Sequence, residues 1–341
     1  MRILAAMSGG VDSSVAAALL LEQGHDVVGV TLKLWGGASD SGCCSVADVE
    51  DARRVAQQLG IDHWVFRFTD DFDDWVVAPY AAAHAAGRTP NPCLECNRHL
   101  KFGRLLRRAD QLGFDAVATG HHARVVAAGA RFHLWRGADR AKDQSYVLHM
   151  LGQAELDRCR FPVGELTKDE VRARARVLGL RTADKPDSQD VCFVTATGGR
   201  TTFLGSRIGL HPGRVVDTDG TEIGRVDAVE LVTVGQRRGL GAGGGEKRYA
   251  LSVDTGSATV VAGSLADLHT RTVDLVDLTW VDGRPDASDA VVVQSSAHGS
   301  PVEATLEGST VRFAEPQRRV APGQSVVLYR AAEVLGGGTA A

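Results

Sequence analysis

The feature that most constrains the fold of this chain is SGGVDSS, at residues 8–14, between the apolar run RILAAM and the Ala/Leu-rich stretch VAAALLLEQ. The apolar spacing of that stretch is helical until Gly24 ends it. A glycine-rich turn that enters a helix presents free backbone N–H groups and the positive end of the helix dipole, and both favour phosphate. The serines can add hydroxyl hydrogen bonds. By itself, such a turn is either a phosphate cradle or an ordinary helix cap.

Strand and helix patterns alternate through the first half of the chain. After the first helix come DVVGVTLKLW as a strand, VADVEDARRVAQQLG as an amphipathic helix and HWVFRFT as a strand. Further along, FDAVATGHHA is typical of a strand that runs into a loop, and KDEVRARARVLG (168–179) of the last regular helix of this half. Strands separated by helices predict an α/β domain with a doubly wound, Rossmann-like parallel sheet.

The pattern changes after about residue 205. Short β-rich runs such as GRVVD, RYALSVD, AVVVQSS and QSVVLYR are separated by turn signals such as DTDG and APGQ. They predict two small antiparallel β-barrel domains. We therefore expect a catalytic domain over residues 1–204, a small central β domain over 205–267 and a C-terminal β-barrel over 268–341.

Composition narrows the function classes. The 341-residue chain is 44% hydrophobic and 23% charged, and it shows neither a membrane-spanning apolar run nor a signal peptide, so we expect a cytoplasmic protein. A net charge of −4 argues against a surface coated in positive charge but leaves room for a local basic face. Six cysteines do not make a disulfide scaffold in a chain of this size, so paired cysteines point to catalysis, redox chemistry or metal binding.

The cysteines of interest are Cys93 and Cys96, in RTPNPCLECNRHLKFGRLLRRA, and Cys192, in KPDSQDVCFV. A thiol near cations and a helix start ionises more readily and becomes a nucleophile. Half a zinc site or a solvated basic helix is the alternative, although no second Cys-x-x-Cys completes a four-cysteine zinc site. The flanks of Cys192 predict a loop that enters a strand, or else a buried core residue. We expect Cys43, Cys44 and Cys159 to be structural.

Two levels of resemblance follow from these motifs. SGGVDSS after the first strand resembles the PP-loop of the N-type ATP pyrophosphatases. In the same order along the chain, GRTPNPCLECNRHLKFG, ATGHHAR, KDQSYVLHML, FPVGELTKDEVR, DSQDVCF, TVGQRRGLG and APGQSVVLY resemble the tRNA-specific 2-thiouridylases over residues 1 to about 330.

The resemblance implies ATP-dependent sulfur transfer. The wobble uridine of a tRNA would be adenylated at O2, and sulfur would then replace that oxygen. Cys192 matches the cysteine that carries the persulfide and Cys96 its partner nucleophile. ATP would bind at ten positions: Ala6, Met7, Ser8, Gly9, Gly10, Val11, Asp12, Ser13, Leu32 and Gly120. The implied cofactors are ATP and Mg²⁺; no dedicated metal site is expected, although Asp12 could hold Mg²⁺ or orient a neighbour.

The implied partners are tRNA and a protein that donates persulfide sulfur, either a cysteine desulfurase or a relay; no membrane partner is expected. Positions that match tRNA contacts of the family are Asn91, Pro92, Cys93, His121, Lys142, Asp143, Gln144 and Gln324. Arg318 and Arg319 of AEPQRRVAPGQ, and GQRRGLG, are further candidates for RNA contact. The uridine must be flipped out of its stack to reach ATP.

This chain departs from the family pattern at two places. Position 93 is Cys where many relatives carry Asp, so Cys93, Cys96 and Cys192 could hold an iron–sulfur cluster, which is a minority hypothesis. The segment VVVQSSAHGSPVE lacks the Arg and Tyr expected of a loop beside the target base.

Two other functions share some of these features. A PP-loop ligase that forms an amide or a guanidine, such as an argininosuccinate synthetase, would share SGGVDSS but would need neither the cysteine pair nor the barrels. A non-catalytic RNA-binding protein with a vestigial nucleotide domain would bind tRNA without consuming ATP.

Overall fold

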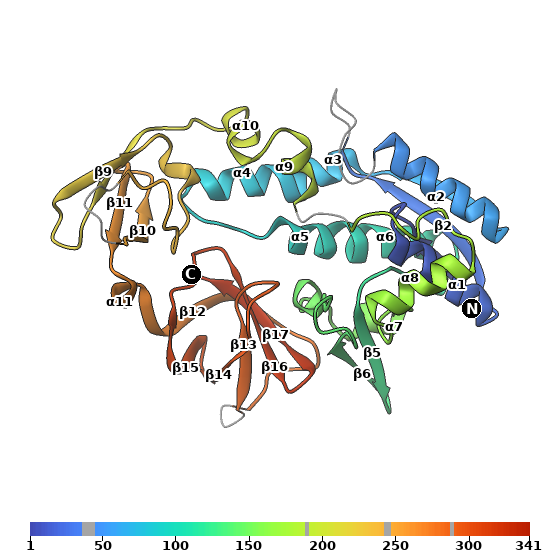
Figure 1. Ribbon diagram of the computed structural model, residues 1–341. Coiled ribbons are helices and arrows are strands. Elements are labelled where there is room, and N and C mark those ends of the chain that lie inside the picture. Colours follow the sequence, from blue (N-terminus) through green and yellow to red (C-terminus); the bar gives the residue numbers. More distant parts are fainter. Residues whose placement is uncertain (36–44, 188–190, 242–246, 287–289) are drawn as a thin grey trace.

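The computed structural model describes residues 1–35, 45–187, 191–241, 247–286 and 290–341 (Figure 1). Cys43 and Cys44 lie outside these ranges. The first strands and helices alternate as the sequence predicts. Five strands form a parallel sheet in the order β3-β2-β1-β4-β7. Their bounds are β1 (Arg2–Ala6), β2 (Asp26–Lys33), β3 (His63–Arg67), β4 (Ala116–Ala118) and β7 (Cys159–Arg160).

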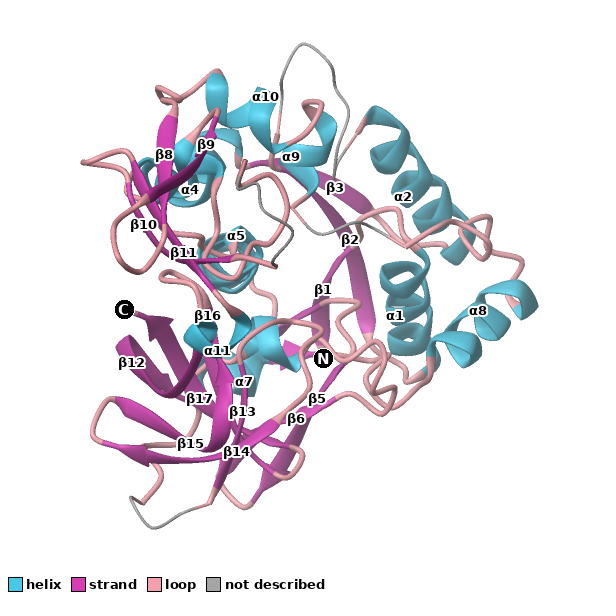
Figure 2. Ribbon diagram, turned by 60° about the vertical axis from the view of Figure 1, so that its left-hand side comes forward, coloured by secondary structure: helices cyan, strands magenta, loops and turns pink. Residues whose placement is uncertain are grey.

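Both faces of this sheet are covered, because successive side chains of a strand point to opposite faces. Ile3 and Ala5 of β1 belong to one apolar cluster with three helices, while Leu4 between them belongs to a second cluster. The first cluster contains side chains of α1 (Val11–Glu22), α2 (Val46–Leu59) and α8 (Lys168–Val177). Figure 2 shows these three helices together beside the sheet. The doubly wound α/β prediction is confirmed.

Two long helices cover the other face, and each contains a π-helical segment. One consists of α3 (Thr69–Phe72), η1 (Asp73–Val77) and α4 (Ala78–Ala85). The other consists of α5 (Pro92–Glu95), η2 (Cys96–Arg104) and α6 (Leu105–Gln111), and it carries the Cys-x-x-Cys motif. The Leu105 N–H donates to the Leu100 carbonyl, a bond that spans five residues. Such π-helical turns are rare and concentrate at functional sites.

Two expectations for residues 180–205 are wrong. Helix α8 is not the last helix of the first half, because α9 (Cys192–Ala196) and α10 (Arg200–Gly205) follow it. Cys192 does not lead from a loop into a strand; it is the first residue of α9. The apolar run after Cys192 suits a helix because Phe193 and Val194 bury their side chains in the second cluster. The Phe193 ring packs against the rings of Trp35, Phe72 and Phe203.

The central β region is a four-stranded sheet in the order β10-β11-β8-β9. Its strands are β8 (Gly213–Val216), β9 (Glu222–Val226), β10 (Tyr249–Asp254) and β11 (Thr259–Gly263). The pairing of β11 with β8 is parallel, so this region is not entirely antiparallel. Two short helices flank the sheet: η4 (Val229–Leu231) and α11 (Leu265–Leu268).

The C-terminal region is a closed antiparallel barrel of six strands, as the sequence predicts. The pairings run β12-β15-β14-β13-β16-β17, and β17 pairs back onto β12. The strands are β12 (His269–Trp280), β13 (Val291–Gln294), β14 (Val302–Glu307), β15 (Thr310–Arg318), β16 (Ser325–Arg330) and β17 (Glu333–Ala340). Closure leaves no free sheet edge among these strands.

A hairpin from the first half joins this barrel. Strands β5 (Ala123–Ala128) and β6 (Arg131–Arg136) pair with each other, and β6 pairs with β17 through Glu333 and Val334. Short helices η3 (Ser145–Leu148) and α7 (Gln153–Arg158) follow. Tyr146 of η3 is fully buried and donates to the Ser325 carbonyl at 2.8 Å. Residues near 130 and 330 therefore belong to one sheet, which the sequence did not predict.

No helix among the described residues is long and apolar enough to cross a membrane.

We predict that Phe313→Ala destabilises the barrel by about 3–5 kcal/mol, because the Phe313 side chain is 3% exposed and its removal leaves a cavity in the barrel core. Urea unfolding followed by fluorescence measures the change. Val276→Ala is the matched control on the same barrel, since Val276 is 41% exposed and its truncation should cost less than about 0.5 kcal/mol. Equal effects of the two substitutions would contradict this assignment of the core.

Candidate active site

The turn between β1 and α1 is built as a cradle. Gly10 is the N-cap residue of α1 in extended conformation, with no side chain to block the helix start. Ser13 Oγ lies within hydrogen-bond distance of three groups of the turn: the Ser8 N–H donates to it at 3.1 Å, Ser8 Oγ lies 3.3 Å away, and it donates to the Gly10 carbonyl at 3.1 Å. Residues 8–14 thus open a helix N-terminus at the carboxyl edge of a central strand, where α/β sheets bind ligands.

Two glycines allow backbone to pack against this cradle. Gly9 has φ +75°, and a Cβ atom there would lie 2.3 Å from the Asp48 carbonyl oxygen. A Cβ atom on Gly120, in the loop after β4, would lie 2.6 Å from Ser13 N. The loop after β4 therefore touches the start of α1, and the two predicted nucleotide-binding segments are brought together.

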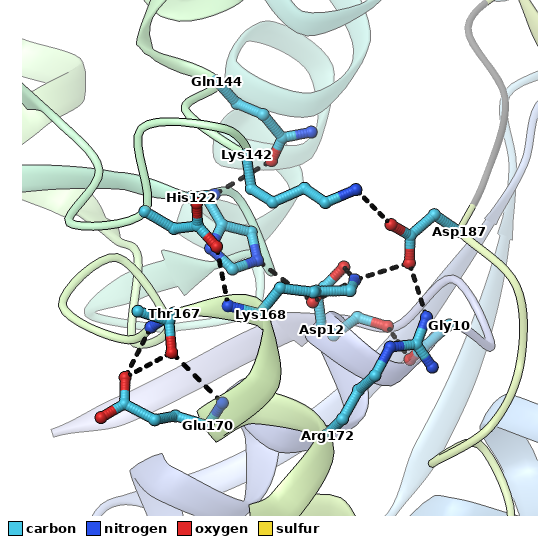
Figure 3. A network of polar contacts seen from close by, with 12 residues as sticks. Gly10, Asp12, His122, Lys142, Gln144, Thr167, Lys168, Glu170, Arg172 and Asp187 are labelled. Carbon is cyan, nitrogen blue, oxygen red and sulfur yellow. Dashed lines mark hydrogen bonds and ion pairs between the residues drawn. The ribbon is translucent and has the colours of Figure 1, made fainter.

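Asp12 is the centre of the polar contacts on this side (Figure 3). Lys168 Nζ donates to both carboxylate oxygens, at 2.8 and 2.7 Å, and His122 Nε2–H donates to Oδ1 at 3.1 Å. Burial opposes ionisation of Asp12, but the hydrogen bonds from His122 and Lys168 outweigh it and lower the pKa of this carboxyl. Asp12 is therefore an anion that is already paired.

Both oxygens of Asp12 accept from one ammonium group, that of Lys168. The magnesium role of Asp12 stays a prediction. Across the described ranges, which include Cys93, Cys96 and Cys192, no group of three or more His, Cys, Asp or Glu side chains is placed to hold a metal ion. The iron–sulfur hypothesis has no support in this geometry, and we derive no step through a metal.

Asp187 gathers three cations of the same network. Lys142 Nζ and Lys168 Nζ each lie 2.8 Å from its oxygens, and Arg172 Nη2 donates to Oδ1 at 2.9 Å. Desolvation would raise the pKa of Asp187, but the bonds from Lys142 and Lys168 dominate and lower it to about 2. This carboxylate therefore stays ionised at any physiological pH.

The same chain segment also touches the first loop directly. Lys185 Nζ donates to the Gly9 carbonyl at 3.0 Å and to carboxylate oxygens of Asp48 and Asp51 at 2.7 and 2.9 Å. Both acids belong to α2, whose N-cap is Ser45. Residues 185–187 thus lie against the cradle, five positions before Cys192.

The cysteine segments converge on one apolar cluster. Asn91 caps α5 by accepting from the Cys93 N–H at 3.0 Å, which places Cys93 and Cys96 on the first turns of the long helix. Cys96 and Cys192 are both half-buried and pack against the cluster on that face of the parallel sheet. Burial raises the pKa of Tyr80, whose ring lies 5.5 Å from that of Phe193, the residue after Cys192.

Other predicted positions are placed as follows. Leu32 is a buried residue of β2, and Pro92 is buried at the start of α5. His121 is buried between Phe102 and Phe161, and burial lowers its pKa well below the usual range, so it is neutral. Their roles in nucleotide or tRNA binding stay predictions.

The predicted tRNA positions 142–144 differ in exposure. Lys142 and Gln144 are exposed, whereas the Asp143 side chain is 6% exposed and accepts from Arg136 at 2.8 Å. Gln144 Oε1 accepts from the His122 N–H at 3.0 Å. Gln324 donates to the Thr89 carbonyl, next to the cysteine segment. None of these contacts tests the predicted tRNA binding.

Reasoning from the sequence missed these residues of the network: His122, Lys168, Arg172, Lys185 and Asp187. The only available signal was a lysine at the first position of α8, after the capping residue Thr167. A cation there opposes the helix dipole, so an acidic partner from elsewhere is required.

Comparison with known proteins covers the whole chain. The family model described as tRNA methyl transferase HUP domain matches residues 1–196; those described as tRNA methyl transferase PRC-barrel domain and aminomethyltransferase beta-barrel domain match 201–264 and 270–340. A protein named tRNA-specific 2-thiouridylase MnmA, from Chloroflexus aurantiacus, is 49% identical over 98% of this chain and 97% of its own length. The protein of that name from Beutenbergia cavernae is 47% identical over 100% of this chain and 95% of its own.

Similarity to solved structures is more distant. A U34-tRNA thiolase, NcsA, from Methanococcus maripaludis with a [4Fe-4S] cluster has a TM-score of 0.38 and 20% identity, over 55% of this chain and 60% of its own. A 4-thiouridine synthetase in complex with RNA and ATP has the same TM-score and identity, over 59% and 46%. Similarities this low say nothing about function.

We predict that Gly120→Ala weakens ATP binding by at least about tenfold, because the new Cβ would meet the backbone of Asp12 and Ser13 and push the two loops apart. Isothermal titration calorimetry with ATP measures the effect. Gly256→Ala is the control, since its Cβ would meet only the Asp254 side chain, at 3.3 Å. Unchanged affinity in Gly120→Ala would mean that the contact between the loops does not shape the nucleotide site.

We also predict that Asp187 contributes to acid stability. Its folded-state pKa, about 2, is below the ordinary 3.8, so its contribution is present above pH 3.8 and is lost as the pH falls toward 2. Asp187→Asn should therefore flatten the loss of thermal stability over this interval. Asp184→Asn is the control because Asp184 is 80% exposed and, among the described residues, its ion pair is with Arg176. Parallel pH profiles for wild type and Asp187→Asn would rule out the linkage.

Proposed function

The chain belongs to the family of tRNA-specific 2-thiouridylases, and from this premise we propose that it replaces O2 of the wobble uridine of tRNA by sulfur, with consumption of ATP. The enzyme would be a tRNA-uridine 2-sulfurtransferase. The observation that carries the proposal is that Cys96 and Cys192 pack against one cluster, on a sheet whose carboxyl edge carries the nucleotide cradle. Neither a ligase nor a passive RNA-binding protein requires two such thiols.

The first chemical step is adenylation. The uridine O2 attacks the α-phosphorus of ATP, the bond from that phosphorus to the bridging oxygen breaks, and pyrophosphate leaves. The backbone N–H groups at the start of α1 are suited to hold the departing phosphates. Adenylation converts O2 from a poor leaving group into part of AMP, which a sulfur nucleophile can displace.

The second stage is sulfur transfer. The terminal sulfur of a Cys192 persulfide attacks C2 of the uridine, and AMP leaves with the former O2. The Cys96 thiolate then attacks Cys192 Sγ; the sulfur–sulfur bond to the uridine breaks and its electron pair stays on the uridine sulfur. A disulfide between Cys96 and Cys192 remains, and an external dithiol must reduce it before the next turnover.

Partners follow from this chemistry. A persulfide-bearing protein, a cysteine desulfurase or a relay, must load Cys192, and we place the reaction in the cytoplasm. For tRNA we propose contacts from Asn91, Pro92 and Cys93, with further contacts from these residues: His121, Lys142, Asp143, Gln144 and Gln324. The side chains of His121 and Asp143 are buried, so they would not contact tRNA directly in this conformation. They would either hold the neighbouring backbone in place around the base or become exposed when tRNA binds.

The test is mass spectrometry of nucleosides from tRNA incubated with the protein, ATP and a persulfide source. We expect 2-thiouridine together with AMP and pyrophosphate in equal amounts. A ligase would release pyrophosphate without changing the tRNA, and a passive binder would bind tRNA without releasing pyrophosphate. A methyl group in place of sulfur would point to the activity in the family-model descriptions. Any of these three results would overturn the proposal.

We predict that Cys192→Ser and Cys96→Ser each lower 2-thiouridine formation by at least about three orders of magnitude. Cys96→Ser should also accumulate a tRNA that is disulfide-linked to Cys192, visible on a gel and released by a thiol reductant. Cys159→Ala is the matched control: Cys159 is buried in β7 and burial raises its pKa, so it is no nucleophile. Full thiolation by Cys96→Ser would contradict the role of Cys96.

A further inference from the structure

Three cations converge on the cradle side of the molecule and share one anion. Lys142 comes from the loop after β6, and Lys168 and Arg172 come from the first two turns of α8. All three contact the carboxylate of Asp187 within 2.9 Å (Figure 3). The three cations thus come from two elements that lie apart in the sequence, the loop after β6 and helix α8, and they meet at one carboxylate.

The cluster adjoins the predicted phosphate site. The Lys168 ammonium that contacts Asp187 also contacts Asp12, the second residue of α1. Two residues before Asp187, Lys185 donates to the Gly9 carbonyl of the cradle. The Asp187 carboxylate is therefore held beside the turn whose backbone N–H groups favour phosphate.

The net charge of this group of side chains indicates which kind of ligand it can bind. Lys142, Lys168 and Arg172 bring three positive charges, against which Asp12 and Asp187 set two. Without Asp187 the cluster would carry a net charge of about +2, next to an open helix N-terminus, which is a site for a polyanion. Ammonium and guanidinium groups bind phosphate oxygens at the same distances as carboxylate oxygens.

We propose that Lys142, Lys168 and Arg172 form the pyrophosphate-binding part of the nucleotide site, and that Asp187 occupies it in the nucleotide-free protein. ATP then exchanges its β- and γ-phosphates for the Asp187 carboxylate. Asp187 is a positioning residue: it keeps the cations assembled before ATP arrives, and it lowers the apparent affinity because it must be displaced. The inference rests on the proposed function in one respect, that ATP binds at the cradle.

The experiment is calorimetric titration of wild type, Asp187→Asn and Asp187→Glu with ATP, pyrophosphate and adenosine. Removal of the competing charge should tighten ATP and pyrophosphate roughly tenfold, whereas adenosine should bind unchanged. Asp187→Glu restores the competing carboxylate and should bind close to wild type. Asp184→Asn removes the same charge from the same segment, at an exposed position, and should leave all three affinities unchanged.

A double-mutant cycle separates competition from a general charge effect. In a Lys168→Met background, the gain in ATP affinity from Asp187→Asn should be at least about threefold smaller, because the cation for which Asp187 and the phosphates compete has been removed. Circular dichroism and thermal unfolding show whether each variant is folded.

Two results would overturn the inference: weaker or equal ATP binding by folded Asp187→Asn, or a gain that is equal for adenosine and pyrophosphate. Either result could be obtained with an enzyme that makes 2-thiouridine normally, and the proposed function would then stand. If wild type bound no ATP and made no 2-thiouridine, the proposed function itself would fail.

Discussion

The geometry of the site depends on one ammonium group, that of Lys168, held between the carboxylates of Asp12 and Asp187. Its side chain is only 10% exposed, so the charge is largely removed from water and its partners cannot be replaced by solvent without cost. The bond to Asp12 fixes α8 against the start of α1. The bond to Asp187 fixes the segment that precedes α9. The backbone N–H of Lys168 adds a third link by donating to Asp139 at 2.9 Å. One residue thus joins the cradle, the loop after β6 and the segment that leads to the second thiol.

Local patterns in the sequence were sufficient for the α/β domain. The first three strands and the helices between them follow from runs of apolar residues and from helical spacing, because each element buries one face or two against the same sheet. The turn at the start of α1 was also predictable from its glycines, and Gly9 is required where the backbone approaches the Asp48 carbonyl. The partners of Asp12 were not predictable. Lys168 lies 156 residues from Asp12 in the chain, and nothing in the composition around either residue specifies such a pairing.

Where the prediction was wrong, tertiary packing decided the structure. The residues around Cys192 alternate in no clear period, and α9 forms because Phe193 meets the rings of Tyr80 and Phe203 at centroid distances of 5.5 and 5.0 Å. Val191, a β-branched residue, adopts φ +51°, a conformation that costs about 1–3 kcal/mol and persists only when its surroundings enforce it. The attachment of hairpin β5–β6 to the barrel was missed because its partner strand, β17, lies almost two hundred residues away in the chain.

A short segment connects the C-terminal barrel with the helix that carries Cys93 and Cys96. Thr89, two residues before Asn91, provides the physical connection. Its N–H donates to the Pro322 carbonyl of the barrel at 2.8 Å, its carbonyl accepts from Gln324, and its hydroxyl donates to Thr233 of the central region at 3.3 Å. Gly323 makes this contact possible, because a Cβ there would lie within 3.3 Å of Arg88 and Pro90. The segment that begins the Cys93–Cys96 helix is therefore held by all three parts of the chain. If the proposed tRNA substrate binds to the barrel, it binds next to the short segment that positions Cys96. Substrate binding and the position of the Cys96 thiol would then depend on the same contacts of Thr89.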